Sequence, residues 1–113
     1  MQLIEQVSVQ EALNSFAKQP VYIHLETTNG AYASHHNTGM TVGAFIRNSV
    51  IHYEHGKITG NNPYRIGLKM EHGWVYAEGL THYELDNKGR LLLAGLNDEG
   101  KLAVAFQLSK EPF

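Results

Sequence analysis

The chain has 113 residues, of which 42% are hydrophobic, and these values fit a single globular domain spanning residues 1–113. The absence of cysteine excludes disulfide bonds, thiolate metal sites and a cysteine nucleophile. The formal charge is −2 at pH 7 and the nine basic residues are scattered along the sequence, so it lacks the basic cluster that a phosphate backbone requires and predicts no nucleic-acid partner.

The first twenty residues predict a helix and no targeting segment. Ser8 and Glu11 form the S-x-x-E pattern of a capping box, which places the helix N-cap at Ser8. Apolar residues recur at helical spacing as far as Ala17, and Pro20 interrupts the pattern, so the helix is expected to end near Lys18. The segment lacks the basic and apolar regions of a signal peptide, and no apolar run reaches the ~18 residues of a membrane span. We therefore expect a cytoplasmic protein that makes no membrane contact.

From residue 21 onward the hydrophobic period changes to two, which is typical of half-buried strands. Asn48 and Ser49 are expected to form either a tight hairpin turn or a bulge in one long strand, and His55 and Gly56 a further turn. The strands are expected at residues 21–26, 42–47, 50–54, 64–70, 74–79, 81–85, 90–96 and 101–108.

Short turns join the later strands. The loops 86–89 and 97–100 each open on Asp or Asn and end on Gly, a composition typical of tight turns. These elements predict a mainly β (α+β) fold, an antiparallel meander of six to eight short strands curled into a barrel or a sandwich with one N-terminal helix. The segment 27–40 has no sustained period, so we expect a loop that is more mobile than the flanking strands.

Histidine and glutamate recur in a pattern that suggests a site. The tripeptide His-x-Glu occurs on three predicted strands, and residues two apart lie on the same face of a strand, here the face away from the core. This face is either a solvated or interface surface, or a site for a divalent metal if the motif strands are neighbours. No residue is assigned a catalytic role, and no cofactor is required. The candidate ligand-binding residues are His24, Glu26, His52, Glu54, His82 and Glu84, with His35 and His36 in the loop 27–40.

Trp74, Tyr76 and Glu78 share one face of their predicted strand. Near Tyr64 and Arg65, the two aromatic rings could form a stacking surface for a ring or a sugar. We favour the alternative, in which Trp74 packs in the core against the helix. The nucleophile elbow, the phosphate-binding loop and the H-E-x-x-H motif do not occur in the sequence.

The last predicted strand, 101–108, is apolar on both faces and carries charge only near its ends. Such a strand lies either in the middle of a sheet or against a second subunit. We expect the second arrangement and therefore a homo-oligomer, most simply a two-fold dimer. A monomer with this strand in the middle of the sheet is the alternative.

Four segments resemble the YojF-like proteins of Bacillus and related Firmicutes. They are VYIHLETTNGAYASH (21–35), GAFIRN (43–48), GWVYAEGLTHYE (73–84) and GRLLLAGLNDEGKLAVAFQLS (89–109). The resemblance runs along nearly the whole chain and implies a cytoplasmic protein. It also implies that the gene often lies beside one for a zinc-dependent deacetylase of the bacillithiol-pathway type. It carries no catalytic residue over to this chain.

These observations predict a non-enzymatic binding or accessory module that acts beside a small-molecule enzyme, the deacetylase being the candidate partner. One alternative is a metal-dependent enzyme that uses the His-x-Glu face, and another is a purely structural homo-oligomer. The metal content of protein purified without a histidine tag would separate the enzyme from the other two.

Overall fold

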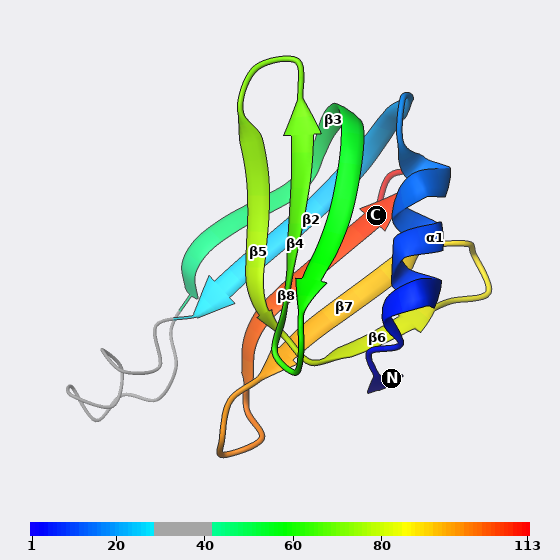
Figure 1. Cartoon of the computed structure of the whole chain (residues 1–113). Helices are drawn as coiled ribbons and strands as arrows, with labels where there is room; N and C mark the ends of the chain where they lie inside the picture. The colour runs from blue at the N-terminus through cyan, green and yellow to red at the C-terminus, as the bar shows by residue number, and fades with distance from the viewer. Residues whose placement is uncertain (29–41) are drawn as a thin grey trace.

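An antiparallel sheet curled into a half-barrel forms most of the molecule, with one helix beside it in the part of the chain that the structure describes (Figure 1). The structure is a computed structural model, and it describes residues 1–28 and 42–113. The elements are β1 (Gln2–Leu3), α1 (Gln6–Phe16), β2 (Pro20–Thr28), β3 (Val42–Gly60), β4 (Tyr64–Met70), β5 (Trp74–Leu80), β6 (His82–Leu85), β7 (Leu91–Leu96) and β8 (Leu102–Ser109). The prediction of a mainly β, antiparallel fold with one N-terminal helix is confirmed. No helix in the described ranges is long and apolar enough to span a membrane.

The strands follow the order β1-β6-β7-β8-β2-β3-β4-β5 across the sheet. Two runs of consecutive neighbours, β2 to β5 and β6 to β8, are joined by the pairing of β8 with β2. β8 therefore lies in the middle of the sheet, where both of its edges are paired, with β7 and with β2, and its residues 104–106, 108 and 109 are buried. This position accounts for its apolar composition, so β8 does not itself require a second subunit.

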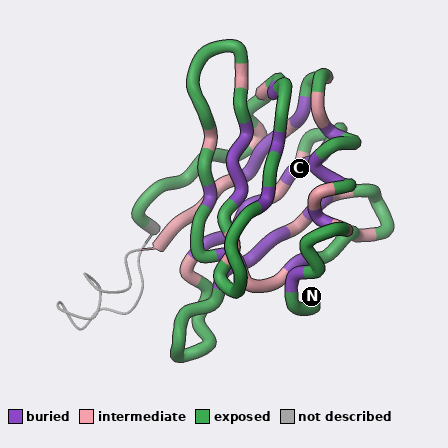
Figure 2. The backbone as a smooth tube through the Cα atoms, viewed as in Figure 1, coloured by how far each residue is buried: buried purple, intermediate pink, exposed green. Residues whose placement is uncertain are grey.

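The core lies between the sheet and α1, which runs beside β3 in Figure 1. Val9, Leu13 and Phe16 recur at helical spacing on one side of α1 and are all buried in the same cluster as Tyr53 of β3. The Tyr53 hydroxyl donates a hydrogen bond to the carbonyl oxygen of Leu13. Figure 2 shows the buried segments of neighbouring strands side by side, while the hairpin loops are exposed.

The helix begins three residues earlier than the capping-box pattern predicts. Glu5 is the N-cap, and its carboxylate accepts hydrogen bonds from the backbone N–H of Ser8, at 2.7 Å, and from the Ser8 hydroxyl. The assignment of Ser8 as the cap was therefore wrong. The backbone N–H of Ile4 donates to the carbonyl of Thr81 at 3.0 Å, which anchors the chain just before residue 5 and allows the helix to start at once. The helix ends at Phe16, so its predicted end near Lys18 was two residues late.

β3 is one long strand, and Asn48 lies at a bulge within it with φ of 54°. The turn predicted at His55 and Gly56 was wrong, because the strand continues there to Gly60. β2 pairs with β3 only as far as His52, which leaves the later part of β3 without a β2 neighbour. Glutamines of α1 bond to this free edge: the Gln10 amide donates to the Gly56 carbonyl at 2.8 Å and accepts from the Ile58 N–H at 3.1 Å.

The turns predicted at 86–89 and 97–100 are confirmed. The Asp86 carboxylate accepts from the N–H groups of Lys88 and Arg90, and the Asn97 side chain accepts from those of Glu99 and Lys101. The two-residue strand β1 was not predicted. The mobile loop expected at 27–40 falls almost wholly outside the described residues, and its first two residues end β2.

The curl of the sheet brings β5, its last strand, against β7 at a pair of glycines. A Cβ atom on Gly95 of β7 would lie 2.1 Å from the carbonyl oxygen of Gly79 in β5. The two backbones therefore approach each other at a distance that only glycine permits. This contact fixes β4 and β5, and the surface that they carry, relative to the rest of the half-barrel.

Candidate functional site

The three His-x-Glu motifs do not come together. The motif strands β6 and β2 are separated by β7 and β8, which corresponds to about 14 Å at the usual strand spacing. His52 of β3 is the cross-strand partner of Pro20 in β2. Pro20 lies four positions before His24, so the His52 and His24 positions are about 13 Å apart along β2. Within residues 1–28 and 42–113, no three or more His, Asp or Glu side chains are grouped so that they could hold a metal ion. His35 and His36 lie outside the described residues.

His24 is buried, at 7% exposure, and so departs from the solvated face that the sequence suggested. The imidazole packs edge to face against Phe45 at 5.3 Å between ring centroids, and against Phe113 at 6.3 Å. Asn48 holds Phe113 in place, accepting from its N–H at 2.6 Å and donating to its carbonyl at 3.1 Å. Burial lowers the pKa of His24, an effect that the Glu26 carboxylate opposes and that Arg47 reinforces.

The other motif residues are partly or fully exposed, and His52 and His82 each contact a residue close to them in the sequence. The His52 Nδ1 lies 3.8 Å from the Glu54 carboxylate, and both side chains are about half exposed. His82 contacts its neighbour Thr81, with 2.7 Å between Nδ1 and the hydroxyl oxygen. These pairs agree with the solvated-face interpretation, and each contributes little to stability at this exposure.

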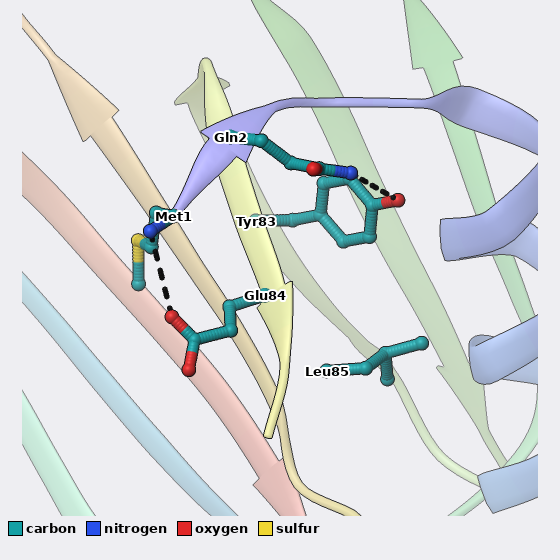
Figure 3. Close-up of a pocket in the computed structure, with 5 residues that line it drawn as sticks. All are labelled: Met1, Gln2, Tyr83, Glu84 and Leu85. Carbon is teal, nitrogen blue, oxygen red and sulfur yellow. Dashed lines mark hydrogen bonds and ion pairs between the residues drawn. The ribbon is translucent and has the colours of Figure 1, made fainter. Parts of the chain in front are cut away.

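A hollow beside β1 and β6 contains the last of the predicted residues (Figure 3). It has a volume of about 400 Å³ and is lined by Met1, Gln2, Tyr83, Glu84 and Leu85. The Glu84 carboxylate lies 3.5 Å from the amino group of Met1, and the Gln2 amide donates to the Tyr83 hydroxyl at 3.0 Å. A ligand would have to replace these internal pairs, so we regard this hollow as the weaker candidate.

A stronger candidate is a pair of aromatic rings on β5. Trp74 and Tyr76 are 50% and 45% exposed, and their rings are stacked at 5.5 Å with an angle of 7° between planes. The prediction that Trp74 packs in the core was wrong, because the alternate residues Val75 and Ala77 take the inward positions. Gly67 on β4, the cross-strand partner of Tyr76, leaves room for the ring: a Cβ there would lie 2.8 Å from it.

Two cations extend this aromatic pair into a ladder. The guanidinium of Arg65 lies 4.0 Å from the centre of the Tyr76 ring, and the Lys69 ammonium lies 5.0 Å from the centre of the Trp74 ring. Each cation–π contact of an exposed pair contributes about 0.5–1 kcal/mol. Arg65 also pairs with the Glu78 carboxylate at 3.2 Å. We call Lys69, Trp74, Tyr76 and Arg65 the aromatic–cation ladder.

β3 adds further basic groups to the same side of the sheet. His55 is the cross-strand partner of Lys69, and Lys57 is that of Gly67, so both side chains lie beside the ladder. All of these basic side chains are exposed. We call the surface formed by the ladder, His55, Lys57 and Glu78 the ladder face. Strand pairing thus brings together three cations that are separated in the sequence, Lys57, Arg65 and Lys69.

The sequence contained only part of the signal for this face. The spacing of Trp74 and Tyr76 predicts a shared strand face near Arg65. Lys57 and Lys69 were missed because their proximity depends on the register of β3 against β4 and β5. Register is set by the whole sheet and cannot be read from one strand.

Comparison with known proteins places the chain in a family. A family model described as a protein of unknown function (DUF1806) matches residues 3–113. The chain belongs to this family. It is 54% identical over 114 residues to the uncharacterized protein YojF of Bacillus subtilis (strain 168), covering 100% of this chain and 98% of the relative. The crystal structure of B. subtilis YojF matches with a TM-score of 0.85 at 50% identity, covering 99% of this chain and 95% of the other. The resemblance to YojF-like proteins is confirmed for essentially the whole DUF1806 domain.

Proposed function

We propose that this DUF1806 protein is a non-enzymatic binding module that acts beside a small-molecule enzyme and uses the ladder face as its binding surface. The observation that carries the proposal is the exposure of Trp74 and Tyr76 on a rigid stack braced by Arg65 and Lys69. Trp, Tyr and Arg are the residue types that contribute most to binding energy at protein interfaces. Because the rings are already held by their neighbours, binding costs little side-chain entropy.

The arrangement of the His-x-Glu motifs supports binding over metal-dependent catalysis. Two histidines and a carboxylate must converge on one position to form a facial triad. Here the motifs lie on β2, β3 and β6, and His24 is covered by Phe45 and Phe113. The proposal therefore assigns these residues no catalytic role.

The resemblance to YojF-like proteins supplies the candidate partner, a zinc-dependent deacetylase of the bacillithiol-pathway type, and a cytoplasmic location.

We also propose a homo-oligomer. Exposed apolar side chains gather at β1 and the start of α1, where Met1, Leu3 and Val7 are 59%, 63% and 62% exposed. A symmetric contact through this region would bury them and protect the β1 edge of the sheet.

The accessory role is tested by calorimetric titration of the protein into the purified deacetylase of the same organism, with the deacetylation rate measured in parallel. We expect saturable binding that Trp74→Ala weakens by about tenfold or more, the loss typical of a central aromatic contact. Leu85→Ala is the matched control, since Leu85 is also 50% exposed but lines the hollow of Figure 3. Absence of binding by the wild type, or equal loss in both variants, would contradict the proposal.

A further inference from the structure

The ladder face carries a charge that is opposite to that of the chain as a whole. Lys57, Arg65 and Lys69 against Glu78 give the face a formal charge of +2, in a chain whose formal charge is −2, so the remaining residues carry −4. Glu78 pairs with Arg65, whereas Lys57 makes no ion pair with any described residue. The face is therefore a local basic surface on an acidic protein.

The groups on this face are mostly hydrogen-bond donors. The ammonium groups of Lys57 and Lys69 and the indole N–H of Trp74 have no hydrogen-bond partner in the described part of the chain. The rim of a stacked aromatic ring is the positive part of its quadrupole, so the edges of Trp74 and Tyr76 add to the same field. Such a surface is complementary to closely spaced carboxylates or carbonyl oxygens.

We infer that the ladder face docks an acidic polypeptide segment of a partner protein. This inference rests on the proposed binding function and names the chemistry of the partner. The ladder runs from Arg65 to Lys69 along β4, which corresponds to about 13 Å of strand. That length suits several residues of an extended chain, with carboxylates at Lys57 and Lys69 and apolar stems against the ring edges.

Other occupants fit this face less well. A second copy of the chain would bring two basic surfaces together, which costs binding energy through like-charge repulsion. A single-stranded nucleic acid needs free ring faces on which its bases can stack. Here the faces of Trp74 and Tyr76 are occupied by each other and by Lys69 and Arg65.

The inference is tested with fluorescein-labelled poly-L-glutamate, whose binding to the whole chain is followed by fluorescence anisotropy at two salt concentrations. We expect saturable binding that weakens with salt and a change in the emission of Trp74, the one tryptophan of the chain. Lys57→Glu and Lys69→Glu should each weaken binding by about tenfold. Lys88→Glu is the matched control, because it makes the same charge change in an exposed turn between β6 and β7 and should leave binding within about twofold.

Circular dichroism shows whether each variant is folded. Equal weakening by Lys88→Glu and Lys57→Glu would mean that net charge alone governs binding and would overturn the inference. So would tighter binding of a single-stranded oligothymidylate than of poly-L-glutamate, or no binding of poly-L-glutamate at all. If the deacetylase binds the wild type and Lys57→Glu equally, this inference fails while the proposed accessory role stands. If the wild type does not bind the deacetylase, the proposed accessory role itself is contradicted.

Discussion

His24 is a buried imidazole whose Nδ1 has no hydrogen-bond partner among the described residues, and its ring lies against Phe45 and Phe113. Burial favours the neutral ring, so the folded protein holds the pKa of His24 below its usual value of 6.5. Between that lowered pKa and 6.5 the unfolded chain binds more protons than the folded chain. The stability that the neutral His24 contributes is therefore fully present above pH 6.5, and it is lost as the pH falls below that value.

We expect the free energy of unfolding to fall from pH 7.5 to pH 5.5, with a contribution from His24 of at most about 1.4 kcal/mol per pH unit. His24→Gln should remove that part of the slope, whereas His52→Gln, at an exposed position, should retain it. Urea denaturation at both pH values measures the effect. The same slope in His24→Gln as in the wild type would show that His24 does not cause it.

Tyr53 joins the helix to the sheet through a single buried hydroxyl. Its side chain is fully buried, burial raises its pKa well above the usual value, and its hydroxyl donates to the Leu13 carbonyl. Tyr53→Phe should cost about 1–2 kcal/mol, because the carbonyl is left without its partner. Tyr76→Phe, which removes an exposed hydroxyl, should cost nothing measurable in the same denaturation experiment. Equal midpoints for both variants would contradict the role of Tyr53.

At the scale of elements, α1 depends on a carboxylate cap. Glu5→Ala removes the acceptor for the Ser8 N–H and hydroxyl, so we expect a lower denaturation midpoint than for the wild type. Glu11→Ala is the control, since that side chain is exposed and makes no capping contact. The hydrogen bonds from Ser8 also lower the pKa of Glu5, so the cap should weaken as the pH falls through that lowered value. If Glu11→Ala lowered the denaturation midpoint more than Glu5→Ala does, the capping box of Ser8 and Glu11 would be the correct assignment.

Elements were predictable from sequence where local chemistry alone decides them. The turns after Asp86 and Asn97 are of this kind, as is the apolar stripe of α1. The helix start was not predictable because Ser is a preferred N-cap residue and Glu is not, so the local pattern favours Ser8. The anchoring of Ile4 by Thr81 instead places the cap at Glu5. Tertiary contacts of this type leave no local signal.

The extension of β3 through Gly56 could not be predicted for the same reason. A His-Gly pair usually marks a turn, and what keeps this one extended is the pairing of Lys57 with Gly67 and the side chain of Gln10 from α1. The candidate site depends on this extension, because β3 places Lys57 beside the ladder. The residue types of the site were visible in the sequence, but their convergence was not.

At the scale of the whole molecule, the half-barrel is held where β5 meets β7. Gly95→Ala would place a methyl group against the Gly79 backbone, which cannot move independently, so we expect a loss of about 1–3 kcal/mol or more. Gly67→Ala is an informative comparison, because its methyl would meet the Tyr76 ring, which can swing aside. We expect a smaller loss of stability there, together with altered Trp74 fluorescence. Similar denaturation midpoints for Gly95→Ala and the wild type would contradict this closure.

The proposed homo-oligomer rests on the exposed apolar residues of β1 and the start of α1, and not on β8. If Met1, Leu3 and Val7 form a symmetric contact, multi-angle light scattering at micromolar concentration should give the mass of a dimer, and Leu3→Glu should give a folded monomer. Lys57→Glu, which lies on the ladder face, should leave the mass unchanged. A monomer mass for the wild type would contradict the proposed homo-oligomer.

Hydrogen-exchange mass spectrometry of the protein with and without saturating deacetylase shows whether the ladder face is the binding surface of this DUF1806 protein. We expect slower exchange in residues 55–59, 65–69 and 74–78, with no change in residues 82–85 beside the hollow of Figure 3. Slower exchange confined to residues 82–85, or around His24, with β4 and β5 unaffected, would contradict it.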